Sequence, residues 1–99
     1  MRQTYQTNTP WAPIVGYSRA VRVGPHVAVT GTTATDAEGD LVGVGNAAVQ
    51  TEQVLDNIRA ALIAVGARIE DVVRTRIYVT DIERDWEAIG RIHGQVFGH

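Results

Sequence analysis

The sequence contains no cysteine and no lysine. Without cysteine, the chain can form no disulfide bond and offers no thiolate as nucleophile or metal ligand. The nine basic residues are all arginine, and they are scattered among 11 acidic residues, which gives a formal net charge of −2. Because the arginines form no basic stripe and are not interleaved with aromatic residues, we expect no nucleic-acid partner.

Long apolar runs are also missing. No stretch approaches the roughly 18 apolar residues that a membrane span requires. The N-terminal residues have no continuous apolar segment of the kind found in a signal peptide. We therefore expect no membrane partner and a cytoplasmic location.

The chain has 99 residues, of which 44% are hydrophobic, and this predicts one globular domain spanning residues 1–99. Residues 1–13 are polar and contain Pro10 and Pro13, so they are expected to form an N-terminal arm, irregular or at a sheet edge. Two short β-prone runs follow, at residues 20–23 and 27–30. Gly24-Pro25 lies between them and favours a turn, so the two runs predict a hairpin.

An amphipathic helix is predicted between Asn46 and Val65, where apolar residues recur every three or four positions. Asn46 is the expected N-cap, and Gly66 is the expected stop in a left-handed conformation. Its polar face is expected to be exposed and to form only weak ion pairs. The charged residues of this face are Glu52, Asp56 and Arg59.

Residues 73–79 alternate between apolar and polar side chains, which predicts a strand with one apolar side. A second helix is expected to begin near Glu83. Its apolar face carries Trp86, Ile89, His93 and Val96. These elements predict an α+β fold in which two helices pack on one face of a mixed β-sheet. Such a thin sheet leaves an open edge, which favours either an oligomer or further strands at the C-terminus.

Several short stretches, in this order and spacing, resemble the RidA/YjgF family, also called L-PSP endoribonuclease. They are GY at 16–17, VAVTG at 27–31, QVLDNI at 53–58, AVGA at 64–67, VRTRIYVTDI at 73–82 and DW at 85–86. The resemblance implies a chorismate-mutase-like fold and a homotrimer with ligand clefts between subunits. It also implies hydrolysis of reactive 2-imino or 2-enamino acids to 2-keto acids and ammonia. We expect no cofactor.

The resemblance implies four substrate-binding residues and identifies no catalytic residue. Tyr17 corresponds to a cleft tyrosine, Thr30 stands where many members have serine, and Gly31 offers a backbone N–H close to the ligand. His93 stands where the well-studied deaminases often have an aromatic residue, and Gly90 stands where they tend to have asparagine.

In the family, the arginine that binds the substrate carboxylate lies on a strand after the second helix. Its guanidinium forms a bidentate pair with that carboxylate. We expect this chain to stop before that strand, with the C-terminal strands missing. None of the nine arginines occupies the matching motif.

Simpler structural roles remain open for these residues. Tyr17 could lie at an edge or interface, and Thr30 could merely end a strand. Arg74 and Arg76 are best explained as solvated or interfacial charges. His93 and His99 are six residues apart, which places them on different helix faces, and no acidic residue stands at a useful spacing. We therefore expect no metal site.

Two main functions follow from the sequence. The first is a Rid-type enzyme that hydrolyses 2-imino or 2-enamino acids, or that acts on a related small carbonyl compound. The second is a trimeric small-molecule binding or regulatory protein on the same scaffold, without deaminase activity. Gly90, His93 and the missing arginine favour the second. A ribonuclease comes third because the charge pattern does not support it.

Overall fold

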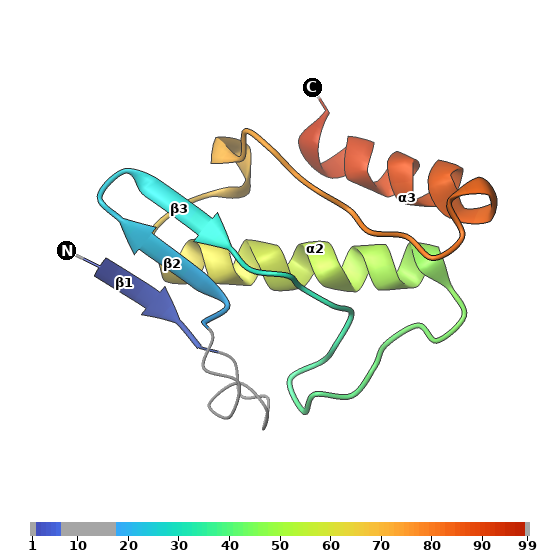
Figure 1. Cartoon of the computed structure of the whole chain (residues 1–99), viewed down its shortest axis with the longest axis horizontal. Coiled ribbons are helices and arrows are strands. Elements are labelled where there is room, and N and C mark those ends of the chain that lie inside the picture. Colours follow the sequence, from blue (N-terminus) through green and yellow to red (C-terminus); the bar gives the residue numbers. More distant parts are fainter. Residues whose placement is uncertain (1, 7–17, 99) are drawn as a thin grey trace.

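The structure is a computed structural model that describes residues 2–6 and 18–98, and it places a small sheet against a layer of helices (Figure 1). The elements, in chain order, are β1 (Arg2–Tyr5), β2 (Ala20–Val23), β3 (His26–Val29), α2 (Ala47–Ala64), the 3-10 helix η1 (Ile69–Asp71) and α3 (Ile82–Phe97). The sheet has the order β1-β2-β3, and both pairings are antiparallel. The predicted α+β fold with two helices is confirmed, and no strand follows α3 in the described residues.

The predicted hairpin is formed by β2 and β3. Gly24, in the turn that joins them, has a φ of +59°, a conformation that favours glycine. In the register, Ala20 lies opposite Val29 and Val23 lies opposite His26. β1 pairs with the other side of β2, so the segment expected to be an arm contains an edge strand.

Helix α2 has both of the ends that the sequence predicts. The side chain of Asn46 accepts a hydrogen bond of 3.1 Å from the backbone N–H of Val49, which is the expected N-cap. At the other end, Gly66 has a φ of +80° and donates its N–H to the carbonyl of Ile63, while Ala67 donates to Leu62. This pair of bonds is a Schellman motif, and it ends the helix.

The core lies between β2 and α2. Ala20, Ala61 and Val65 are at most 1% exposed, and Val27 and Val29 pack against them. Small alanine side chains on both elements allow the sheet to approach the helix closely. Because side chains alternate along a strand, the residues next to Ala20 and Val29 face away from α2.

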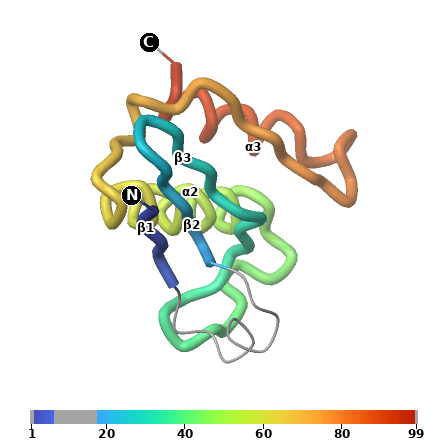
Figure 2. The backbone as a smooth tube through the Cα atoms, turned by 60° about the vertical axis from the view of Figure 1, so that its left-hand side comes forward, coloured from blue at the N-terminus to red at the C-terminus, as the bar shows by residue number. Residues whose placement is uncertain are grey.

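Residues 72–79 do not form the strand that the sequence predicts. They run as a stretched segment alongside α3 (Figures 1 and 2), and no backbone hydrogen bond of residues 73–79 is found within the described part of the chain. Val73 and Ile77, expected on an apolar face, are 98% and 50% exposed. The alternating pattern predicts which side chains share a face. A strand also requires a neighbour to which it can bond.

Helix α3 begins where the sequence indicates. The carboxylate of Asp81 accepts a hydrogen bond of 3.1 Å from the backbone N–H of Arg84, which is an N-cap. α3 packs beside α2 and extends the helical layer past the three-stranded sheet (Figure 2). Ile89 is the buried residue of α3. Neither α2, α3 nor η1 is long and apolar enough to cross a membrane.

Candidate functional site

Thr30 and Gly31, two predicted substrate-binding residues, lie directly after β3. The backbone N–H of Thr30 donates to the carbonyl of Arg19 at 2.9 Å, and its hydroxyl Oγ1 donates to the same oxygen at 3.2 Å. The carbonyl of Thr30 in turn accepts a bond of 2.9 Å from the hydroxyl of Thr32. Thr30 is therefore held on both sides, and the lone pairs of its hydroxyl oxygen can still accept a hydrogen bond from a ligand.

Gly31 is exposed, and a Cβ placed on it would meet no atom within 4 Å. Within residues 2–6 and 18–98, its backbone N–H has no hydrogen-bond acceptor. An N–H without an intramolecular acceptor is the type of donor that binds a carbonyl or carboxylate oxygen. The geometry thus leaves this N–H available to a ligand.

The loop that follows Gly31 is held in place by two amide side chains of α2. Asn57 donates from Nδ2 to the carbonyls of Thr33 and Thr35, at 3.2 and 2.9 Å. Gln53 donates from Nε2 to Thr35 and to Oδ1 of Asn57, at 3.3 and 2.9 Å. Neither residue is among the substrate-binding residues predicted from the sequence. Two amides four positions apart on one helix were the available signal, since such residues are neighbours on a helix.

Arg19 is the buried charged residue of the described chain, with 6% of its surface exposed. Its backbone N–H donates to the carbonyl of Tyr5 at 2.7 Å, and its carbonyl accepts both bonds from Thr30. The hairpin register continues by one residue to place Arg19 opposite Thr30, so both face away from α2. The side-chain Nε of Arg19 has no hydrogen-bond partner in the described structure. In the sequence, Arg19 is one of nine scattered arginines. Only its burial in the structure distinguishes it.

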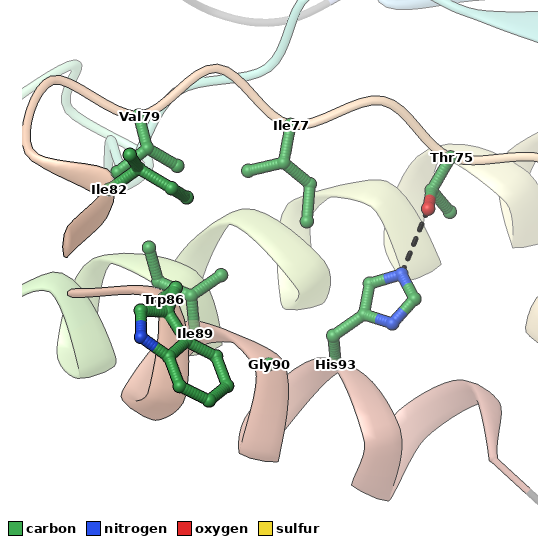
Figure 3. Close-up of a pocket in the computed structure, with 8 residues that line it drawn as sticks. All are labelled: Thr75, Ile77, Val79, Ile82, Trp86, Ile89, Gly90 and His93. Atoms are coloured by element: carbon green, nitrogen blue, oxygen red, sulfur yellow. Dashed lines mark hydrogen bonds between the residues drawn. The ribbon is translucent and has the colours of Figure 1, made fainter.

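His93 lies in a different place, an open groove of about 380 Å³ between residues 75–79 and α3 (Figure 3). Its Nε2 and the hydroxyl of Thr75 are 2.8 Å apart, and its ring centroid is 4.6 Å from that of Phe97. Ile77 and Val79 point from the stretched segment toward α3. The groove is lined by Thr75, Ile77, Val79, Ile82, Trp86, Ile89, Gly90 and His93.

The walls of this groove are mainly apolar. The Thr75–His93 pair is its hydrogen-bonded polar contact, and Trp86 is 59% exposed at its other end.

Near the groove, Arg84 donates hydrogen bonds to the Asp85 carboxylate, and these bonds lower the pKa of Asp85. The bonds and the charge of Asp85 raise the pKa of Arg84. Within the described residues, no three His, Asp or Glu side chains are grouped to hold a metal ion.

Of the four predicted substrate-binding residues, the three that the structure describes lie in two places. Thr30 and Gly31 lie together at the end of β3, whereas His93 lines the groove on α3 with Gly90. Tyr17 lies outside the described residues, as does His99. The assignment of these residues to a ligand site remains a prediction.

Comparison with known proteins identifies one family. The model of the family described as endoribonuclease L-PSP matches residues 7–99. A YjgF/YER057c/UK114 family member from Mycobacterium tuberculosis has a TM-score of 0.86 and 45% identity, over 99% of this chain and 75% of that one. RidA from the Antarctic bacterium Psychrobacter sp. PAMC 21119 has a TM-score of 0.77 and 34% identity, over 91% of this chain and 72% of that one.

Sequence relatives agree with the structural neighbours. An uncharacterized protein of Streptomyces coelicolor is 38% identical over 93% of this chain and 67% of its own length. The 3-aminoacrylate deaminase RutC of Acinetobacter baylyi is 34% identical over 92% of this chain and 69% of its own length. The matches extend over the hairpin, α2, the stretched segment and α3, and the chain belongs to the RidA/YjgF family, whose model is described as endoribonuclease L-PSP.

Proposed function

We propose that this protein hydrolyses reactive 2-imino or 2-enamino acids to 2-keto acids and ammonia, or acts on a closely related small carbonyl compound. The relative from Acinetobacter baylyi carries the name of a deaminase of 3-aminoacrylate, which is an enamino acid. The observation that carries the proposal is the Thr30–Gly31 segment after β3, where a fixed hydroxyl lies next to a backbone N–H that has no acceptor in the described residues.

The chemistry requires little of the protein beyond positioning. Water adds to the imine carbon, the resulting carbinolamine expels ammonia, and a carbonyl group remains. An imine also hydrolyses unaided in water, so oriented hydrogen bonds can supply most of the acceleration. The oxygen of Thr30 can accept a hydrogen bond from the protonated imine nitrogen, and the Gly31 N–H can donate to an oxygen of the substrate.

The anchoring of the loop by α2 supports this assignment. Asn57 and Gln53 fix the carbonyls of Thr33 and Thr35, and this limits how far the Gly31 N–H can move. Preorganised donors cost little reorganisation during a reaction. We further propose that the protein acts as a homotrimer with clefts between subunits, which would allow the groove around His93 and the Thr30–Gly31 segment to belong to one site. Native mass spectrometry tests this assembly.

The activity is tested by generating 2-iminobutanoate in situ and trapping it with semicarbazide. The protein should suppress formation of the adduct. Thr30→Val keeps the shape of the side chain and removes the hydroxyl, and we expect it to lower the rate about tenfold, which corresponds to about 1.4 kcal/mol of transition-state stabilisation. Thr33→Val is the matched control, because Thr33 is exposed and only its backbone carbonyl is bound by Asn57. Absence of suppression by the unmodified protein would reject the deaminase activity.

A second candidate is a binding or regulatory protein without deaminase activity. It is favoured by His93, which stands where an aromatic residue is expected and forms a hydrogen bond with Thr75. A protein that binds 2-oxobutanoate but leaves the semicarbazide adduct unchanged would belong to this class.

A further inference from the structure

Two edges in this structure have no neighbour strand in the described residues, and we propose that one further β-strand inserts between them. The edges belong to β3 and to residues 73–79. The match with the Mycobacterium tuberculosis relative covers 99% of this chain but 75% of the relative, so about a quarter of the relative has no counterpart here. That quarter is the source of the inserted strand. This interaction surface does not depend on the activity proposed above.

The first argument is the backbone of residues 73–79. The segment is stretched, and within the described chain none of its N–H or carbonyl groups takes part in a backbone hydrogen bond. These groups are the unpaired donors and acceptors of an edge strand. Such an edge pairs readily with an added strand, which gains main-chain hydrogen bonds along its whole length.

The second argument is the outer edge of β3. This strand pairs with β2 and stands at the end of the three-stranded sheet. The N–H of Thr30 donates to Arg19, on the side of β2. Because successive N–H groups along a strand point to opposite edges, those of Val27 and Val29 point to the outer edge. An inserted strand would supply their acceptors.

The third argument is the arrangement of the two edges over the helices. β3 packs on α2, α2 packs on α3, and residues 75–79 lie beside α3. β3 and the stretched segment run in the same direction in both views (Figures 1 and 2). They are joined through a helix, the connection typical of parallel strands in one sheet. No backbone hydrogen bond of the described chain links them, so a strand between them would satisfy both edges at once.

The groove on α3 indicates the chemistry of the inserted strand. Ile77 and Val79 point toward α3 and line this open groove of about 380 Å³, where Trp86 is 59% exposed. Apolar side chains at every second position of the inserted strand would cover these walls. Arg74 and Arg76 alternate with the groove residues, are exposed and form no ion pair within the described residues. An acidic residue at an intervening position would pair with them.

The test supplies the strand as a separate peptide. A synthetic peptide with the sequence of the unmatched quarter of the Mycobacterium tuberculosis relative is titrated into the ¹⁵N-labelled 99-residue protein, and amide hydrogen exchange is measured by NMR. At saturation, exchange should slow about tenfold or more at Val27, at Val29 and at every second amide of residues 73–79, because these groups gain acceptors. A peptide of the same composition in scrambled order is the control and should leave exchange unchanged.

Two variants test the contact with the groove. Ile77→Ser removes an apolar side chain from the groove wall, and we expect it to weaken peptide binding about fivefold or more. Ile63→Ser makes the same change at an exposed isoleucine of α2 and should leave the affinity unchanged. If Ile77→Ser failed to fold, hydrogen exchange in the unmodified protein would still decide the question.

Three results would overturn the proposal. The first is unchanged exchange at both edges with saturating peptide. The second is slower exchange in residues 73–79 alone, with Val27 and Val29 unchanged, since the peptide would then not lie between the two edges. The third is protection of both edges that appears without peptide and grows with protein concentration, which would identify a second copy of this chain as the occupant.

Discussion

The two halves of this molecule both contain amphipathic sequence patterns, but they differ in how completely their apolar side chains are packed. In the closed half, formed by β1, β2, β3 and α2, the strands bond to one another, and Ala20 of β2 is buried against Ala61 and Val65 at the end of α2. In the open half, residues 72–97, an alternating segment lies beside α3 without a bonded neighbour strand in the described chain.

The difference shows what an amphipathic pattern contributes by itself. Ile77 and Val79 face α3 as the alternation predicts, yet they line an open groove. Burial requires a second layer, and a strand ladder requires a partner strand. Only the closed half has both in the described residues, so we expect it to provide most of the stability.

The largest contrast is expected between two valine truncations. Val65 is 1% exposed in the closed half, and Val73 is 98% exposed in the open half. Val65→Ala should lower the free energy of unfolding by about 2 kcal/mol, because it removes buried methyl groups and leaves a cavity. Val73→Ala should change it by less than about 0.5 kcal/mol. Urea unfolding followed by circular dichroism measures both values.

Equal losses in the two variants would contradict this contrast. They would mean that Val73 is buried in solution by a contact outside the described chain, for example in an assembly of subunits. Repeating the unfolding at several protein concentrations provides the control, because an oligomeric contact makes stability depend on concentration.

Local signals were sufficient to predict the closed half. Gly24-Pro25 marks the hairpin turn, and Asn46 and Gly66 mark the ends of α2, because each acts within a few residues of its own position. The prediction of a strand at residues 73–79 was wrong because it depends on a contact that is not local. Its hydrogen bonds would have to come from a distant segment, and alternation in the sequence carries no information about whether that segment is present.

A smaller contrast is expected between two sets of hydrogen bonds. In the closed half, Asn57 donates to the carbonyls of Thr33 and Thr35, whereas in the open half Thr75 forms one exposed bond to His93. Asn57→Ala should cost about 1 to 2 kcal/mol, since it removes both hydrogen bonds that Nδ2 of Asn57 donates to the loop. Thr75→Val should cost about 0.5 kcal/mol or less, because it removes one exposed hydrogen bond. Differential scanning calorimetry of both variants tests the order.

A larger loss for Thr75→Val would reverse this interpretation. It would indicate that the Thr75–His93 bond fixes the stretched segment on α3. Hydrogen exchange of residues 73–79 would then increase in the variant, because the segment would separate from the helix more often.

The candidate site was less predictable than the fold. Thr30 and Gly31 are found through the resemblance to the family, since threonine and glycine at a strand end are common in any protein. The anchoring role of Asn57 depends on a loop that approaches α2 from 22 to 24 positions away. The burial of Arg19 arises from tertiary packing and has no local signature in the sequence.

The smallest effect is expected for the ion pair at the start of α3. Hydrogen bonds from Arg84 hold the pKa of Asp85 below its ordinary value. Because the pKa is lower in the folded state, the pair stabilises the fold fully above the unfolded pKa of about 3.9, and this contribution is lost as the pH falls through the lower, folded pKa. Asp85→Asn should therefore lower the urea midpoint slightly at neutral pH and have no such effect in strong acid, with Asp56→Asn on α2 as a matched control. A difference between Asp85→Asn and the unmodified protein that persisted in strong acid would show that the asparagine acts through helix packing and not through the charge.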